Sequence, residues 1–258
     1  MTREAYSFVR TFAPEPARDL RVDRHYLLCA SAGALRLEAQ GQAWLLPPAR
    51  AALIEAGQPI RVSLPQPVRT ASVLFDTGFT AAPPAPLTVF DLNPLARALV
   101  TECGAWGEND EPLTSYARTL FAALAAVTWR LAGQPSPVVV PVGRSPELRR
   151  ALELTEERLG GEVRFEAVSD EVGLAPRSLA RRFEDETGMT WRAVLRRMRV
   201  LRAIEELAAG DAPVTRIAFM VGYASLSAFN AAFRELTGRT PTEYRASFRP
   251  GPVPVEDS

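Results

Sequence analysis

Apolar and polar positions recur at helical spacing through the C-terminal half of the chain, and one pattern occurs there twice, about fifty residues apart. Each copy has a small residue four positions before a glycine, then two apolar residues four positions apart, then Thr-Gly-x-Thr. The first copy comprises Ser169, Gly173, Leu179, Phe183 and 187–190, and the second comprises Ala218, Gly222, Phe229, Phe233 and 237–240. Residues four apart lie on one face of a helix. Each copy therefore predicts two helices that cross at a tight turn, a helix-turn-helix whose second helix keeps one face exposed.

The stretch between the copies, residues 190–209, predicts one long helix. It contains neither glycine nor proline, and its apolar residues recur at helical spacing. Gly210 and Pro213 are expected to end it. Twenty residues at ~1.5 Å each make a rod of roughly 30 Å, close to the ~34 Å of one DNA turn. Two helix-turn-helix units on such a rod are suited to read two successive major grooves.

The first 80 residues predict short strands instead. Residues 35–38, 60–64 and 68–75 alternate or run apolar, and glycines and prolines separate them. This spacing is typical of a small antiparallel barrel or jelly roll. Residues 94–105 and 113–131 then predict two helices. Their apolar faces carry Leu95, Leu99, Leu113, Leu120, Phe121, Leu124 and Trp129.

The composition suggests where the domains divide. Residues 132–146 carry four prolines and two glycines, which predicts a linker. We therefore expect a first domain over 1–131, a second over 147–248 and a disordered tail over 249–258. No apolar stretch approaches the ~18 residues of a membrane span, and we expect no signal sequence, because the first residues lack the charged-then-apolar pattern of one. Two cysteines are too few for a disulfide framework, so the expected compartment is the cytoplasm.

The net charge of the chain is zero, so charge bears on the predicted contact with DNA only locally along the sequence. All thirty basic residues are arginine, whose planar guanidinium suits phosphate and guanine. Residues 177–202 hold eight arginines against three acids, whereas 147–171 hold four arginines against eight acids. The excess lies across the first helix-turn-helix and the rod. A local basic strip is what contact with phosphates requires.

Residues 145–248 resemble the DNA-binding domain of the AraC/XylS family of transcription regulators. The similarity covers almost all of residues 222–245, including Pro241 and Tyr244. Residues 41–64 are similar to the cupin-type sensor domain of one branch of that family. The resemblance implies an α+β multidomain fold, with an N-terminal cupin-like antiparallel β-barrel plus helices and a C-terminal all-α double helix-turn-helix.

The same resemblance implies a set of partners: double-stranded DNA, a small-molecule effector, RNA polymerase and a second copy of the chain. In the family, helices at the positions of 94–105 and 113–131 often pair two subunits. The alternative for these helices is that they only cover the barrel. We expect neither a membrane partner nor a cofactor.

On the first reading helix, Leu179 and Phe183 are expected to face inward. The open face then carries Arg177, Ser178, Ala180, Arg181 and Arg182. The resemblance places base contacts at Arg177, Ala180 and Arg181, and arginine can bind guanine through two hydrogen bonds. Arg182 is expected to contact a phosphate or to pair with Glu186, one turn further along.

On the second reading helix, Phe229 and Phe233 are expected to face inward. This leaves Leu226, Ser227, Asn230 and Ala231 toward DNA. Many family members carry an arginine at the position of Ala231. Asn230 could pair with adenine, and Leu226 could touch a thymine methyl. We therefore expect the first copy to carry most of the sequence information.

Two other classes of protein share some of these sequence features. A cupin-like enzyme would need a metal held by two or three histidines, and this chain has one, His25. Relatives that bind metal have a histidine where this chain has Ile60, after Pro59. We therefore expect no catalytic residues and no metal site, with His25 structural or lining a pocket. The third class is an interaction module whose helix-turn-helix no longer binds DNA, which Ala231 and the zero net charge leave open.

Overall fold

The computed structural model describes residues 3–65, 67–108, 112–136 and 139–246. The chain divides into two compact units. Unit 1 contains residues 1–37, 45–136 and 242–258, and unit 2 contains 38–44 and 137–241. The predicted disordered tail, 249–258, lies outside the described residues.

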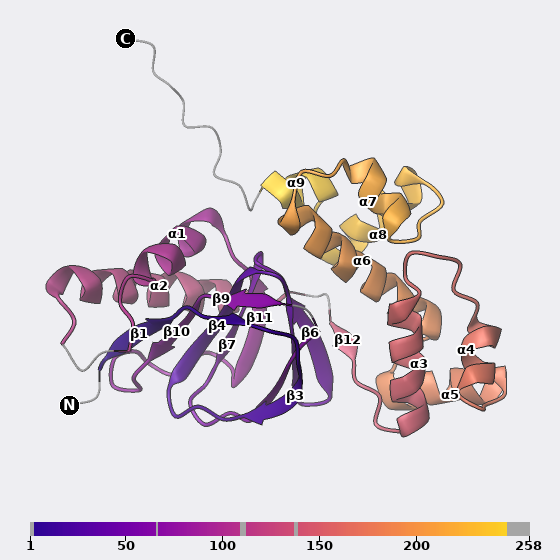
Figure 1. The fold of residues 1–258 in the computed structure, drawn as a ribbon, viewed down its shortest axis with the longest axis horizontal. Helices are drawn as coiled ribbons and strands as arrows, with labels where there is room; N and C mark the ends of the chain where they lie inside the picture. Colours follow the sequence, from indigo (N-terminus) through magenta and orange to yellow (C-terminus); the bar gives the residue numbers. More distant parts are fainter. Residues whose placement is uncertain (1–2, 66, 109–111, 137–138, 247–258) are drawn as a thin grey trace, which may run out of the picture. The chain divides into compact units, whose positions relative to one another are not determined.

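Two curled antiparallel sheets make up the N-terminal part of the fold (Figure 1). The larger has the strand path β1-β10-β4-β7-β11, with β9 pairing to β4 and β2. Its strands are β1 (Ala5–Phe8), β2 (Thr11–Phe12), β4 (His25–Ala32), β7 (Arg50–Ile54), β9 (Val68–Thr70), β10 (Ser72–Phe75) and β11 (Leu87–Asp91). The smaller has the order β12-β6-β5-β8-β3. Its strands are β3 (Glu15–Leu20), β5 (Leu35–Ala39), β6 (Gln42–Leu46), β8 (Ile60–Leu64) and β12 (Val140–Pro141).

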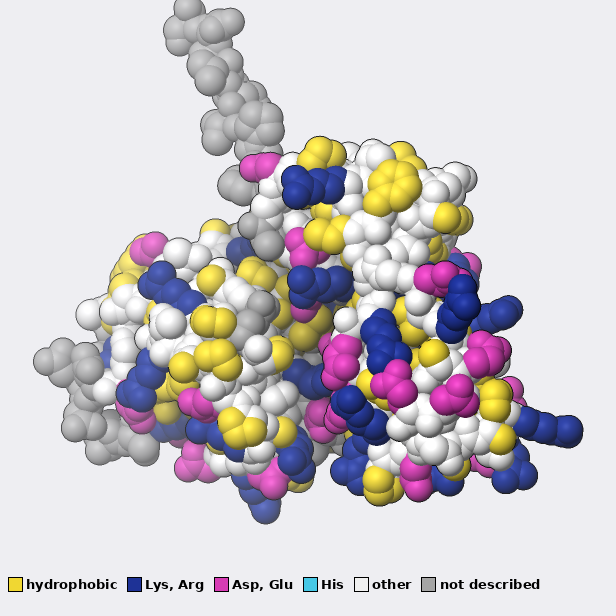
Figure 2. Space-filling view, turned by 45° about the vertical axis from the view of Figure 1, so that its right-hand side comes forward, with side chains coloured by type: hydrophobic (Ala, Val, Ile, Leu, Met, Phe, Trp, Pro, Cys, Tyr) yellow, Lys and Arg dark blue, Asp and Glu magenta, His cyan; other side chains and the backbone are white. Residues whose placement is uncertain are grey.

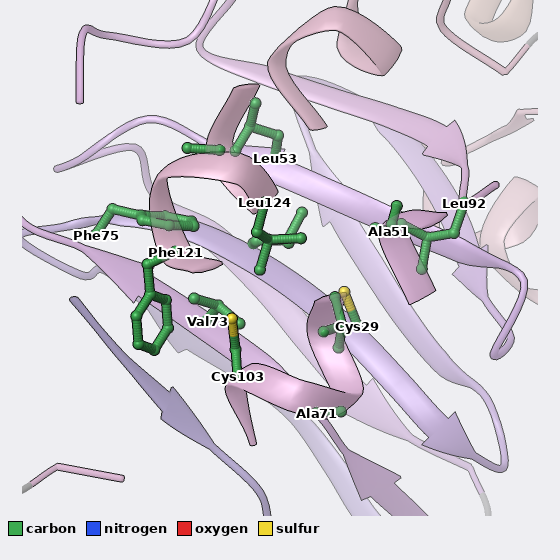
Figure 3. Packing of buried hydrophobic residues seen from close by; sticks show 14 of the residues in the cluster. Cys29, Ala51, Leu53, Ala71, Val73, Phe75, Leu92, Cys103, Phe121 and Leu124 are labelled. Carbon is green, nitrogen blue, oxygen red and sulfur yellow. The ribbon is translucent and has the colours of Figure 1, made fainter. Parts of the chain in front are cut away.

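Two helices, α1 (Pro94–Cys103) and α2 (Ser115–Ala132), cover one face of the larger sheet. Asn93 caps α1 by accepting from the Ala96 amide, and Thr114 caps α2 by accepting from the Ala117 amide. Figure 3 shows Cys103 of α1 and Phe121 and Leu124 of α2 in the apolar cluster that the sheet shares with these helices. The helices therefore cover the barrel, which is one of the two alternatives given from the sequence.

Strand β4 is buried on both faces, and successive residues serve different layers. Leu27 and Cys29 belong to the cluster beneath the helices. Tyr26 and Leu28 instead line a cavity inside unit 1. Side chains alternate across a strand, so one strand builds both the helix-covered core and the cavity wall.

Unit 2 is helical, apart from residues 38–44 and β12, and its helices gather at the two ends of a long central helix (Figure 1). They are α3 (Pro146–Glu157), α4 (Phe165–Glu171), α5 (Pro176–Thr187), α6 (Trp191–Ala209), α7 (Val214–Met220) and α8 (Leu226–Thr237). A last helix, α9 (Pro241–Ala246), begins where unit 2 ends, and its remaining residues group with unit 1.

Most predicted elements are present. Residues 60–64 form β8 as expected, and 68–75 form β9 and β10 with an interruption at Ala71. The predicted helices 94–105 and 113–131 are α1 and α2 within two residues at each end. The stretch 132–146 contains β12, which pairs with β6, so part of the expected linker is a strand of the smaller sheet.

Candidate DNA-binding interface

The two sequence repeats fold into the same tight turn, each between a pair of helices. Ser169 and Ala218 are fully buried where the helices cross. Their carbonyl oxygens accept from the amides of Leu174 and Tyr223, both over 3.0 Å. The glycines have φ of +72° at Gly173 and +86° at Gly222, a left-handed conformation that favours glycine. The two repeats therefore share a backbone hydrogen bond as well as a sequence pattern.

The second helix of each repeat, α5 and α8, is fixed by the apolar pair that the sequence predicted. Leu179 and Phe183 on α5 are fully buried, as are Phe229 and Phe233 on α8. Each helix ends in a left-handed glycine, Gly188 or Gly238. Because each inner face is fixed, the residues on the opposite face stay at the surface.

Helix α6 joins the two repeats. It begins after Thr190, whose hydroxyl accepts from the Ala193 amide, and runs for 19 residues. The indole of Trp191 donates to the Thr155 hydroxyl of α3 over 3.0 Å, which attaches α6 to the first repeat's bundle. Arg196 forms an ion pair with Glu235 of α8, which attaches it to the second.

On α5, three of the five predicted residues are exposed: Arg177, Ser178 and Arg181. Within the described residues, neither of these two arginines has an ion pair. Ala180 is half-buried. Arg182 is half-buried too, and its Nη1 donates to Glu147 of α3 over 2.7 Å.

Glu186, the partner considered for Arg182, has another role. One of its carboxylate oxygens accepts from the backbone amides of Arg144 and Ser145, over 2.6 and 2.9 Å, at the start of α3. Burial acts to raise the pKa of Glu186, but these hydrogen bonds and the charge of Arg182 hold the pKa below its usual value. Arg182 and Glu186 therefore both hold α5 against α3.

On α8, Ser227 and Ala231 are exposed, whereas Leu226 and Asn230 are half-buried. Ser225 caps the helix by accepting from the Ala228 amide over 3.2 Å. The Asn230 Oδ1 is shielded from solvent and has no hydrogen-bond partner among the residues that the structure describes. Its side chain must therefore rotate before its amide can pair with a base.

An open groove of about 1090 Å³ lies within unit 2, beside α6. Its walls come from the start of α4, from α5, from α6 and from the turn between α7 and α8. Four arginines line it: Arg164, Arg192, Arg196 and Arg199. Glu162, Glu166 and Glu184 lie among them, and Figure 2 shows arginine and acidic side chains intermingled over this unit. The basic strip predicted from the sequence is thus a mixed surface.

Comparison with known proteins identifies the repeated region. A family model described as a helix-turn-helix domain matches residues 168–247, which include both repeats. The HTH-type transcriptional activator RhaS of Escherichia coli is 30% identical over 139 residues, which is 54% of this chain and 49% of that protein. Residues 168–247 form a helix-turn-helix domain. The chain as a whole spans about half the length of the curated relatives it matches.

Two solved structures are similar to parts or most of the chain. The C-terminal domain of AraT, a response regulator from Geobacillus stearothermophilus, is 26% identical with a TM-score of 0.40, covering 44% of this chain and 94% of that one. ToxT from Vibrio cholerae is 12% identical with a TM-score of 0.42, covering 96% of this chain and 100% of that one.

Some residues that shape the helix-turn-helix domain were missed by sequence reasoning. Glu147 and Glu235 pair with Arg182 and Arg196 from 35 and 39 residues away, so no local spacing reveals them. Gly160 follows α3, outside the repeats, and the repeat pattern gave no reason to consider it. Its role appears only when its neighbours in space are known.

The described residues also bear on metal binding and membrane insertion. They contain no group of three or more His, Cys, Asp and Glu side chains placed to hold a metal ion. His25 is buried, and its Nδ1 accepts from the Ala56 amide over 3.2 Å. No helix in the described part of the chain is both long and apolar enough to span a bilayer.

Proposed function

We propose that this protein is a sequence-specific DNA-binding transcription regulator that places α5 and α8 in two successive major grooves. The observation that carries the proposal is the pair of turns with the same backbone hydrogen bond, joined by one continuous helix, α6. Its 19 residues span roughly 29 Å, close to the ~34 Å of one turn of DNA.

We assign base reading mainly to α5. Arg177 and Arg181 are exposed and free of ion pairs within the described residues, so their guanidinium groups are available to guanine. Ser178 and Ala180 lie beside them. The contact with Glu147 makes Arg182 a residue that positions α5, with a phosphate contact as its secondary role.

For α8, we assign positioning and modest specificity. Ser227 and Ala231 are exposed but short, and Leu226 offers an apolar contact to a thymine methyl. Asn230 contributes only after its side chain rotates.

The test is selection from a library of random DNA duplexes by the full-length protein, followed by binding titrations with the selected duplex. We expect a recurring sequence, and a large loss of affinity when Arg177 and Arg181 are both replaced by Ala. A matched control is Arg130→Ala, which removes an exposed arginine from α2 in unit 1. An unselected library and equal affinities for all duplexes would instead favour an interaction module that does not read DNA.

In unit 1, we propose that the cavity beside β4 binds a small effector. Its volume is about 340 Å³, within the range of small-molecule sites. Apolar side chains from both sheets line it, among them Leu28, Leu35 and Leu74. Arg10, Arg18, Glu15 and Glu108 supply charges to the same cavity. This lining fits a compact, mainly apolar molecule that carries a polar group.

A thermal-shift screen of small amphipathic acids and amines on the full-length protein tests this. A ligand should raise the melting temperature of the wild type. It should not raise that of Leu28→Trp, in which the larger side chain fills the cavity. Equal shifts in both proteins would place the ligand elsewhere.

Three further assignments complete the proposal. A cytoplasmic location fits two free, buried cysteines. A homodimer formed through unit 1 fits the exposed apolar residues Leu95 and Tyr116 on α1 and α2. We assign RNA polymerase as a partner because an activator of transcription acts on it, and the E. coli relative is named a transcriptional activator.

A further inference from the structure

A contact between the two repeats lies beside the middle of α6. The loop that follows α3, residues 158–161, reaches the end of α7 and the turn after it, residues 220–223. The loop belongs to the bundle of the first repeat, and the turn is that of the second. We call this contact, with Arg199 of α6 inside it, the brace.

Arg199 holds both sides of the brace. Its Nη2 donates to the carbonyl oxygen of Gly161 in the loop over 3.2 Å. Its guanidinium carbon lies 5.7 Å from the centre of the Tyr223 ring in the turn, a cation–π contact. The Tyr223 ring packs against Phe229 of α8 at 5.3 Å, so the contact continues to the inner face of the second reading helix.

Two glycines let the backbones approach this closely. A Cβ atom on Gly222 would lie 2.4 Å from the Leu159 carbonyl oxygen and 2.7 Å from the Arg199 Nη2. A Cβ on Gly160 would lie 2.9 Å from the Met220 carbonyl oxygen. Any side chain at these positions would force the loop and the turn apart, since two of the obstructing atoms belong to the backbone.

The first repeat contains the same turn without a brace, so it shows which requirement for glycine comes from the turn itself. Gly173 occupies the place of Gly222, with φ of +72° against +86°. A Cβ on Gly173 would meet nothing within 4 Å. The left-handed turn accounts for glycine at both positions, but only Gly222 is also required by a neighbour.

We propose that Arg199, with Gly160 and Gly222, fixes the orientation of the two helix-turn-helix units. This orientation sets the spacing that the protein accepts between two DNA half-sites, the stretch of sequence read by α5 and the stretch read by α8. Arg199 is a positioning residue here, since it acts on DNA through the helices that it holds. A single helix can bend, and a second contact at its middle restricts that bending. The claim about spacing rests on the proposed function, whereas the claim about orientation does not.

The orientation is tested without DNA. Cysteines introduced by Asp170→Cys on α4 and Thr215→Cys on α7, both exposed positions, carry nitroxide labels. The two natural thiols are buried, and burial raises their pKa values to about 12, so the parent chain should take up no label. Pulsed electron paramagnetic resonance on the full chain then gives the distribution of label-to-label distances.

We expect one narrow distribution for the wild type and a broader or displaced one for Arg199→Met and Gly222→Ala. Gly173→Ala is the matched control for backbone strain, and Arg192→Met is the control for loss of an arginine from α6. Both should keep the wild-type distribution. If Gly222→Ala and Gly173→Ala give the same distribution, or Arg199→Met gives that of the wild type with unchanged helicity, the brace does not set the orientation.

The spacing is tested with a selected duplex and with versions carrying one extra base pair between half-sites. One base pair shifts the second half-site by ~3.4 Å and rotates it by roughly a tenth of a turn. The wild type should prefer the original spacing, and Arg199→Met should reduce that preference by about tenfold. An even loss of affinity at every spacing would overturn the assignment of spacing while leaving DNA binding intact.

Discussion

At the scale of single residues, the proposed reading of DNA depends most on Arg181. It lies on the exposed face of α5, two positions from each of the buried residues Leu179 and Phe183. Within the described residues, no acid pairs with it. Its guanidinium therefore need not give up an ion pair in order to bind a guanine.

Replacing Arg181 by Ala should cost about 1–3 kcal/mol of binding to the selected duplex and relax preference at one base position. The measurement is a titration against the duplex and its single-base variants at two salt concentrations. Arg192→Ala, an exposed arginine on α6, should weaken binding evenly and lower the salt slope by about one. A uniform loss for Arg181→Ala, with base preference intact, would make it a phosphate contact.

A second residue-scale feature is the carboxyl group of Glu205 on α6. Burial is the main cause that raises its pKa, to about 7, although Arg202 donates to it over 2.9 Å. The folded protein therefore binds this proton more tightly than the unfolded chain does. Stability that depends on the proton is present below pH 4.5 and is lost as pH rises through about 7.

Glu205→Gln should accordingly remove part of the pH dependence and raise stability at pH 8, by up to about 3 kcal/mol. Melting temperatures of the full chain between pH 5 and 9 measure this. Glu206→Gln, which removes the other carboxylate that pairs with Arg202, should keep the pH dependence. Identical pH profiles for the wild type and Glu205→Gln would contradict the assignment.

At the scale of elements, the two reading helices differ at their first turns. Helix α8 has Ser225 at its N-cap, whereas α5 has Ala175, which offers no side-chain acceptor. A serine cap typically stabilises a helix by about 1 kcal/mol relative to alanine. Helix α5 should therefore fray more readily than α8 before it binds DNA.

Exchanging the caps should reverse this difference. Hydrogen exchange of the full chain, followed peptide by peptide, should show amides of α5 protected about fivefold more in Ala175→Ser. Amides of α8 should exchange about fivefold faster in Ser225→Ala. Unchanged exchange in both variants would mean that tertiary packing alone holds these turns.

Elements defined by local signals could be predicted from the sequence. The predicted rod, 190–209, is α6 with its start shifted by one residue, because Thr190 caps the helix and Gly210 follows it. Strand β4 gave no alternating pattern, since both of its faces are buried. The pairing of Arg182 with Glu147 could not be predicted, because the local candidate, Glu186, is held by the start of α3.

At the scale of the whole molecule, helices α1 and α2 bear on the proposed self-association. Leu95 on α1 is 54% exposed and Tyr116 on α2 is 60% exposed, although the rest of their apolar faces packs on the sheet. A contiguous exposed apolar surface is typical of a face that meets another chain, and the proposal is that Leu95 and Tyr116 contribute to one. These helices therefore have two roles in the proposal, to cover the sheet and to join two copies.

Leu95→Glu in the full chain should shift the protein toward the monomer, because the new charge would be buried against the second copy. Sedimentation velocity over a range of concentrations measures the shift. Phe219→Glu is the matched control, since Phe219 on α7 in unit 2 is 53% exposed. A protein that stays dimeric with Leu95→Glu and dissociates with Phe219→Glu would move the interface to unit 2.

The double burial of β4 has a consequence for how relatives of this protein can diverge. Leu27 and Cys29 lie in the core beneath the helices, and Tyr26 and Leu28 face the cavity. Substitutions at the second pair reshape the cavity without touching the first. An insertion of one residue would exchange the two sets and disrupt both layers. Along this strand, substitutions at Tyr26 and Leu28 should therefore be tolerated more readily than a change of length.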